Sequence, residues 1–158
     1  MTIAFSKKEN KQHTLTCTRT DGSQTWMQVS DFFVAHDLMH YATETVLQYK
    51  DAFYGMLNRA INITDFEKPK SQRTVVLSEQ AIIAEHLVNL LLIEHNQGAM
   101  ADFNETLLLS FAADNPEIKP PVVSEETHKK IHNIFSEQIN KWYKLATGQT
   151  LVLNFNNN

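Results

Sequence analysis

Residues 36–44 are the part of the chain best suited to chemistry, because two histidines and a glutamate follow one another there at helical spacing. His36, His40 and Glu44 occupy positions i, i+4 and i+8, and residues four apart lie on one face of a helix. Neutral imidazole and carboxylate are ligands of zinc and other divalent transition metals. The spacing therefore predicts a site for zinc, or for another divalent transition metal, on one helix face.

The residues around this pair suggest a division of roles. His36 and His40 can share one ion, as the two histidines of an H-E-x-x-H helix do. Asp37 or Glu44 would be a third ligand or the general base of a hydrolase-like reaction, in which the metal activates water. Glu44 lies one turn beyond His40 and could instead orient the His40 ring by accepting a hydrogen bond from it.

A further metal ligand is expected from a second helix. Residues 78–96 are apolar almost all round, apart from a polar arc formed by Glu85, His86 and Asn89. We take His86 from this arc as the additional ligand, because imidazole is the commonest ligand of transition metals in proteins. The alternative is that His86 is a hydrogen-bonded histidine of the core.

The other histidines in helical segments are interpreted as structural. Glu94 and His95 end the central helix, where a cationic histidine suits the helix dipole. The last helix begins with Glu125 and His128, followed by His132. Glu-x-x-His occurs in carboxylate-bridged di-iron bundles, where two helices carry it. Only one copy stands here, and capping alone favours a glutamate at a helix start, so a di-metal site is not the preferred hypothesis.

The cluster at residues 36–44 is also compatible with other functions. Phe33 and Leu47 fall within its polar arc and indicate that this face is covered, so its charges need partners or a metal. The alternative is a non-enzymatic interaction or structural module, including a homodimer formed through sheet edges or exposed aromatic residues. In that alternative His40 is more than half exposed. A third interpretation is a pocket for an apolar small molecule beside Tyr41 and Phe53.

Composition limits the class of protein. The chain has 158 residues, 42% apolar and 20% charged, with a formal net charge of -4, which is typical of one globular domain and disfavours a nucleic-acid partner. The longest apolar run, Leu90 to Ile93, is far shorter than the ~18–20 residues of a membrane span. The first residues lack the apolar run of a signal peptide. With Cys17 as the single cysteine, we expect a cytoplasmic protein without disulfides.

The periodicity of the sequence predicts an α+β fold in one domain over residues 1–158. The first thirty residues alternate apolar and polar positions, with Asp21-Gly22 as a hairpin turn, and residues 149–155 alternate again. Asp31 is the expected cap of the first helix, and residues 62–77 are expected to be loop. Helical periodicity covers residues 32–47, 51–61, 78–96, 102–113 and 124–146. We therefore expect an N-terminal antiparallel β-meander, joined by a C-terminal strand and packed against four or five helices.

Two resemblances accompany these patterns. The segment from His36 to Glu44, the run Ala52-Phe53-Tyr54-Gly55 and the ending from Trp142 to Leu153 resemble short, uncharacterised bacterial α+β proteins that carry an H-D-L-x-H helix. That resemblance implies architecture alone. The H-D-x-x-H of residues 36–40 also resembles the zinc-ligand motif of the coenzyme Q biosynthesis family, which implies zinc. The position twelve residues after His40 holds Ala52, where that family has a glutamate.

Overall fold

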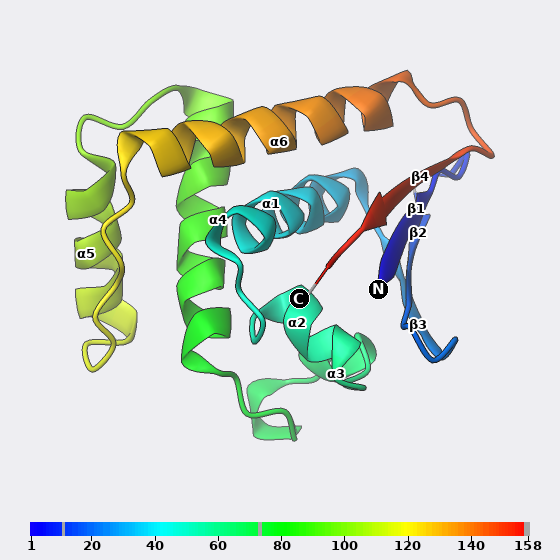
Figure 1. Ribbon diagram of the computed structural model, residues 1–158, viewed down its shortest axis with the longest axis horizontal. Helices are drawn as coiled ribbons and strands as arrows, with labels where there is room; N and C mark the ends of the chain where they lie inside the picture. The colour runs from blue at the N-terminus through cyan, green and yellow to red at the C-terminus, as the bar shows by residue number, and fades with distance from the viewer. Residues whose placement is uncertain (11, 73, 157–158) are drawn as a thin grey trace.

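Four strands form one antiparallel sheet in the computed structural model, which describes residues 1–10, 12–72 and 74–156. The strands are β1 (Thr2–Ser6), β2 (His13–Thr18), β3 (Gln24–Val29) and β4 (Thr150–Asn154). Their order is β3-β2-β1-β4, so the C-terminal strand pairs with the first one (Figure 1). This confirms the expected α+β class and the meander closed by a C-terminal strand.

The sheet buries alternate residues, as the period of two predicts. Phe5 of β1 lies opposite Leu15 of β2 and Leu151 of β4, and all three side chains are buried. Cys17 lies on the same buried face, opposite Ile3. The expected Asp21-Gly22 hairpin joins β2 to β3, and Gly22 takes the left-handed conformation with φ +84° that glycine adopts without steric cost.

The described residues form six α-helices, all on the buried side of the sheet (Figure 1). They are α1 (Asp31–Leu47), α2 (Phe53–Asn58), α3 (Thr64–Glu67), α4 (Glu79–Gln97), α5 (Phe103–Asp114) and α6 (Glu125–Lys144). Within residues 62–77, α3 and a 3-10 turn at Lys70–Gln72 replace the expected loop. That prediction was wrong because helices of three or four residues carry no periodicity. None of the described helices is long and apolar enough to cross a membrane.

Side-chain caps fix where the long helices begin. Ser30, and not Asp31 as expected, caps α1 by accepting a hydrogen bond from Phe33 N–H. Asp31 is the first helical residue, and its carboxylate pairs with the buried His13 of β2 at 2.9 Å. Ser78 caps α4 in the same way. These caps satisfy N–H groups that the first helical turn leaves without partners.

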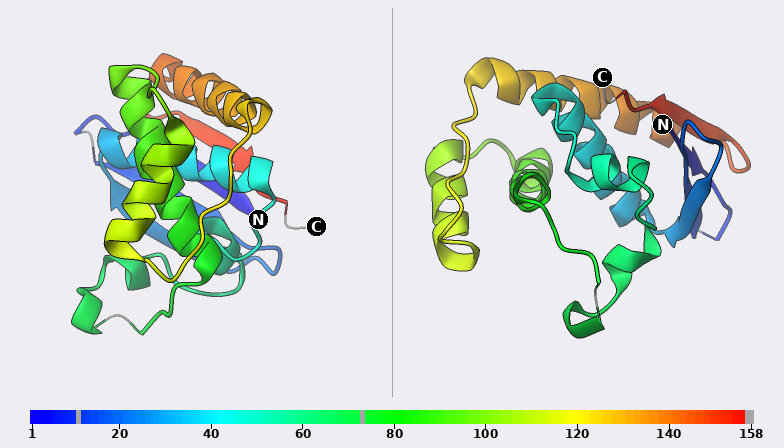
Figure 2. Two further views of the ribbon diagram at one scale, coloured as in Figure 1. Left: turned by 90° about the vertical axis from the view of Figure 1, so that its left-hand side faces the viewer. Right: turned by 60° about the horizontal axis from the view of Figure 1, so that its bottom comes forward.

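The helices stand in a row that leads away from the sheet. α1 lies next to the sheet, α4 lies beyond α1, and α5 lies outermost, while α6 runs across α1 and α4 (Figures 1 and 2). α4 buries apolar side chains on several sides, including Leu87, Val88 and Leu91, as its all-round apolar pattern predicted. This arrangement places one face of α1 directly against α4.

Candidate metal centre

His36 and His40 lie one turn apart on α1 and face the same side of it. Their ring centroids are 4.8 Å apart, because the helix continues without a break from Asp31 to Leu47. The His40 residue is 3% exposed, and the His36 side chain is 14% exposed. The two histidines are therefore close together and sheltered from solvent. The interaction-module alternative expected His40 to be more than half exposed, and it is not.

The Glu85 carboxylate of α4 contacts both imidazole rings. Its Oε1 lies 3.5 Å from Nε2 of His36, and its Oε2 lies 3.2 Å from Nε2 of His40. In a tetrahedral zinc site with bonds of about 2.0 Å, neighbouring ligand atoms are about 3.3 Å apart. Each histidine Nε2 thus lies about that far from one Glu85 oxygen, and the ligand atoms of the three side chains all lie within 4.8 Å of one another.

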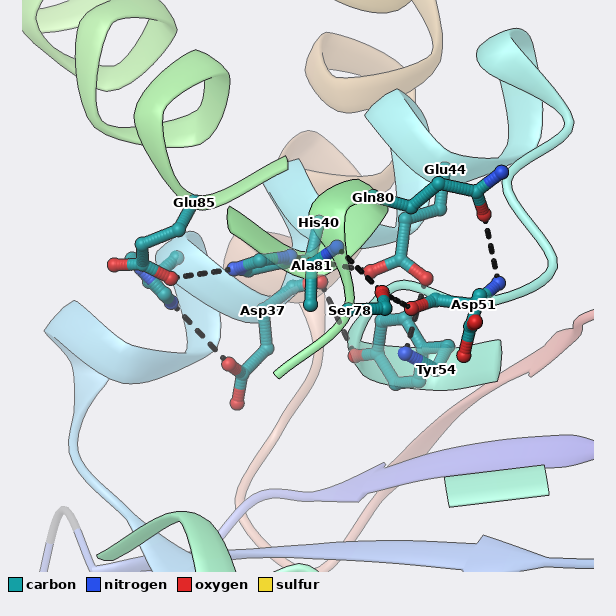
Figure 3. A network of polar contacts seen from close by, with 10 residues as sticks. Asp37, His40, Glu44, Asp51, Tyr54, Ser78, Gln80, Ala81 and Glu85 are labelled. Atoms are coloured by element: carbon teal, nitrogen blue, oxygen red, sulfur yellow. Dashed lines mark hydrogen bonds and ion pairs between the residues drawn. The ribbon is translucent and has the colours of Figure 1, made fainter. Parts of the chain in front are cut away.

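Glu44 supports His40 from the opposite side of its ring. The Nδ1 atom of His40 lies 3.1 Å from Glu44 Oε1, and Tyr54 N–H donates to Glu44 Oε2 at 3.0 Å (Figure 3). The Glu44 residue is fully buried. A carboxylate that accepts from Nδ1 fixes the tautomer of a histidine and leaves Nε2 free to bind a metal.

Asp37 has the equivalent relationship to His36. Its Oδ1 lies 3.4 Å from His36 Nδ1, and its backbone carbonyl accepts a hydrogen bond from the buried Tyr54 hydroxyl at 3.1 Å. Both rings of the pair therefore point Nδ1 at a carboxylate of their own helix and Nε2 at Glu85. This arrangement presents two Nε2 atoms and one carboxylate to a common point.

The charges of these groups are strongly coupled. Burial lowers the His40 pKa, but hydrogen bonds to Glu44 and Glu85 outweigh burial and raise the pKa to about 10. Burial also lowers the His36 pKa, which Asp37 and Glu85 together raise above its usual value. Hydrogen bonds from the two histidines lower the Glu85 pKa. Burial raises the Glu44 pKa. Without a metal, these shifts favour the protonated form of His40 between Glu44 and Glu85.

A cavity of about 600 Å³ opens beside the cluster. His36, His40 and Glu85 form one wall of it, together with Asp37. The remainder of the lining is mostly apolar and comprises Met27, Gln28, Phe33, Phe53, Ile63, Phe66, Leu77 and Ala81. A small apolar pocket with a few polar groups at one side is typical of a small-molecule site. A larger hollow of about 1010 Å³ follows β3, but its lining residues include no ionisable side chain.

The connection from α1 to α2 is held against the start of α4, which fixes the wall behind Glu44. Gln80 accepts hydrogen bonds from the backbone N–H groups of Lys50 and Asp51 at 3.0 and 2.8 Å, and the Ser78 hydroxyl donates to the Asp51 carbonyl (Figure 3). Gly55 of α2 lets the backbone of Lys50 pack closely against it, because a Cβ atom at position 55 would lie 2.3 Å from the Lys50 carbonyl oxygen.

The expected ligand His86 lies outside this cluster. Its Nδ1 contacts the Ser110 hydroxyl at 3.0 Å, its Nε2 contacts the Asn115 amide at 3.0 Å, and its ring stacks on Phe111. His86 therefore faces α5, as in the alternative of a hydrogen-bonded core histidine. Its neighbour Glu85, from the same polar arc of α4, lies beside His36 and His40, where His86 was expected.

Comparisons with known proteins add no homologue. No family model, curated protein or solved structure matches the chain. The function is therefore argued from the geometry of His36, His40 and Glu85 and from the cavity beside them.

Proposed function

We propose that this chain is a divalent transition-metal protein with hydrolase-like activity toward small, partly apolar molecules. The observation that carries the proposal is the convergence of His36 Nε2 and His40 Nε2 on the Glu85 carboxylate, at 3.5 and 3.2 Å, on the wall of a cavity. Two imidazoles and one carboxylate form a ligand set typical of catalytic zinc, where the fourth position is left to water or substrate. Zinc bound there would lower the pKa of water and polarise a carbonyl or phosphoryl oxygen.

The surrounding carboxylates have different roles in this proposal. Both Glu44 oxygens already accept hydrogen bonds, from His40 and from the Tyr54 backbone, so Glu44 acts as a positioning residue. Asp37 lines the cavity, and its carboxylate contacts His36 at 3.4 Å, which is longer than the contacts of Glu44. Asp37 is therefore our candidate for the general base, which takes a proton from the attacking water and returns it to the leaving group.

The lining of the cavity supports a proposal for the substrate class. Its aromatic lining, Phe33, Phe53 and Phe66, would bury an acyl chain or an aromatic ring. The ionisable groups are confined to the wall formed by α1 and α4, where the scissile bond would lie. We propose a small ester or phosphoester with an apolar substituent as the substrate class, in a cytoplasmic setting that suits the lone, buried thiol of Cys17.

Metal content of the untagged protein is the decisive measurement. Purified protein is loaded with Zn²⁺, dialysed, and measured by elemental mass spectrometry beside the H36A/H40A and E85A variants. We expect each variant to lose one equivalent of zinc relative to the parent. The Glu85 side chain is 52% exposed, so E85A separates loss of metal from loss of fold. The exposed histidine His95 of α4 provides a control, since H95A should keep the parental content.

Activity is tested on p-nitrophenyl esters of increasing acyl length and on p-nitrophenyl phosphate. We expect zinc-dependent turnover in the parent, loss of turnover in E85A, and a preference for longer acyl chains. Unchanged zinc content in both E85A and H36A/H40A would overturn the metal site. Zinc binding without turnover on any substrate would retain the site and overturn the proposed chemistry.

A second candidate function is an interaction module that forms a homodimer. β3 lies at an edge of the sheet, and Trp26 of β3 and Phe32 of α1 are 60% and 64% exposed. Unpaired strand edges and exposed aromatic residues favour association. Analytical ultracentrifugation tests this candidate. A dimer that the W26K or F32K substitution dissociates supports it. A protein that stays monomeric over a 100-fold range of concentration overturns it.

A further inference from the structure

A second cluster of the same composition lies where α6 begins and α4 ends. His128 and His132 are four residues apart on α6, and their ring centroids are 4.6 Å apart. The Nε2 atoms of both rings approach one oxygen, Glu94 Oε2 of α4, at 2.5 and 3.3 Å. Each of the three side chains therefore offers a ligand atom within 4.8 Å of the others.

The Glu94 carboxylate is held in position from its other side. The Glu94 side chain is 4% exposed, and its Oε1 accepts a hydrogen bond from the Met100 backbone N–H at 2.9 Å. That contact fixes the carboxylate plane and turns Oε2 toward the two histidines. A buried carboxylate needs hydrogen bonds or a positive charge nearby, and a divalent cation between these three side chains would supply the charge.

The two clusters repeat one design on opposite sides of α4. In each cluster, a His-x-x-x-His pair from a neighbouring helix contacts one glutamate of α4. The pair on α1 contacts Glu85, and the pair on α6 contacts Glu94. The two glutamates are nine residues apart, which separates them by about 13.5 Å along the axis and by about half a turn around it. Dinuclear centres hold their ions about 3.5–4 Å apart, so the clusters correspond to two separate mononuclear sites.

The surroundings of the second cluster differ from those of the first. None of its three residues lines either hollow described above. The Phe103 ring of α5 packs edge-on against the His128 ring, with centroids 4.9 Å apart. The two histidine side chains are about a quarter exposed, at 26% and 25%, which leaves an ion access from solvent.

We infer that Glu94, His128 and His132 form a second divalent-metal site, of zinc type, that ties the start of α6 to the end of α4. Its three protein ligands would leave the fourth position of a zinc ion to water. The inference is independent of the proposed function at the first cluster, because the two sites share no ligand.

The test is zinc binding by untagged protein, with each histidine pair as the matched control of the other. Native mass spectrometry and calorimetric titration with Zn²⁺ should give two ions for the parent. The H128A/H132A variant and the H36A/H40A variant should each retain one ion, and the combination of both pairs should retain none. E137Q, at an exposed glutamate of α6, should keep two.

An ion that ties α6 to α4 should also change stability and local exchange, which activity assays do not report. At zinc concentrations about 100-fold above Kd, occupation of a native-state site should raise Tm by several degrees. Amide hydrogen exchange over residues 125–132 should slow on zinc addition in the parent and in H36A/H40A, but not in H128A/H132A.

Each outcome bears on one site. If H128A/H132A binds as many ions as the parent, or if its exchange at residues 125–132 still slows on zinc addition, the second site is overturned whatever the first one does. Loss of one ion in H128A/H132A with retained circular dichroism supports it. If that variant fails to fold, E94Q takes its place, because it keeps the acceptor for Met100 N–H and removes the charge. E94Q should bind one ion fewer than the parent, and binding of the parental number of ions overturns the site.

Discussion

His40 and Glu44 form a buried histidine–carboxylate pair within a single turn of α1. Nδ1 of His40 lies 3.1 Å from Glu44 Oε1, and the two side chains are 4% and 0% exposed. Glu44 uses its other oxygen to accept from the first turn of α2, a helix whose N-cap residue Ala52 provides no side-chain hydrogen bond. One carboxylate thus orients a candidate metal ligand and also stabilises the start of the next helix.

Replacing Glu44 by glutamine should weaken zinc binding at the first site without removing a ligand. A neutral amide cannot favour the Nδ1–H tautomer of His40 as strongly as a carboxylate does, and the loss of such partners typically costs 10–100-fold in metal affinity. Competition with a chromophoric chelator measures the change. E137Q, at an exposed glutamate of α6, should bind as the parent does, and an E44Q affinity within twofold of the parent would contradict the positioning role.

Asp37→Asn tests the proposed general base. The substitution keeps the size of the side chain and removes its ability to accept a proton, so kcat should fall by about 10²–10⁴, while zinc content stays at the parental level. Steady-state hydrolysis at saturating zinc gives kcat, and elemental mass spectrometry gives the metal content. Parental kcat in D37N would exclude Asp37 as the base.

The metal-free protein should lose stability as the pH rises. Burial opposes the His40 proton, but Glu44 and Glu85 raise the His40 pKa from 6.5 to about 10, so the folded state keeps a proton that the unfolded state releases above 6.5. This stabilisation is complete below about pH 6.5 and disappears as the pH passes 10. The free energy of unfolding should fall by up to about 1.4 kcal/mol per pH unit between these limits.

Urea denaturation in EDTA at several pH values measures this dependence. H40Q should flatten the slope, because no proton is then bound between the carboxylates. Zinc should flatten it as well, since metal binding requires neutral imidazole and displaces the proton. Equal slopes for H40Q and the parent would show that another group controls the alkaline loss of stability.

Gly55 is a position where any side chain should destabilise the fold. A Cβ atom would lie 2.3 Å from the Lys50 carbonyl oxygen, and forcing that backbone apart should cost about 1–3 kcal/mol. Chemical denaturation of G55A gives the value. The matched control is G22N, since the hairpin glycine has open space around it and asparagine tolerates a positive φ. We expect G22N to lose less than G55A, and the reverse order would contradict the packing argument.

The helical wheel of α1 was sufficient to predict the histidine pair but not its partner on α4. The spacing of His36 and His40 places both rings on one face wherever that helix packs. The polar arc of α4 offered both Glu85 and His86, which point about 100° apart, and only the rotation of α4 against α1 selects between them. That rotation depends on how the apolar side chains of α4 pack, which no local pattern records.

The cluster of Glu94, His128 and His132 was not predicted from the sequence, because His128 was assigned to a Glu-x-x-His motif instead. Glu125 and His128 form the Glu-x-x-His motif at the start of α6, but His128 pairs with His132 and with Glu94 from another helix. The available signal was a second His-x-x-x-His spacing on α6, together with a glutamate in the last turn of the largely apolar helix α4. Pairing them requires the crossing of α4 and α6, which a long connection through α5 sets.

The opposed carboxylates of α4 also restrict how that helix can turn. At a side-chain radius of about 5–6 Å, each ten degrees of rotation about the helix axis sweeps a carboxylate sideways by about 1 Å. Since Glu85 and Glu94 project from opposite sides, such a rotation carries one of them in one direction and the other in the reverse direction. The two histidine pairs therefore fix the rotation of α4 about its axis. A substitution that rotates α4 should move both glutamates away from their histidine pairs at the same time.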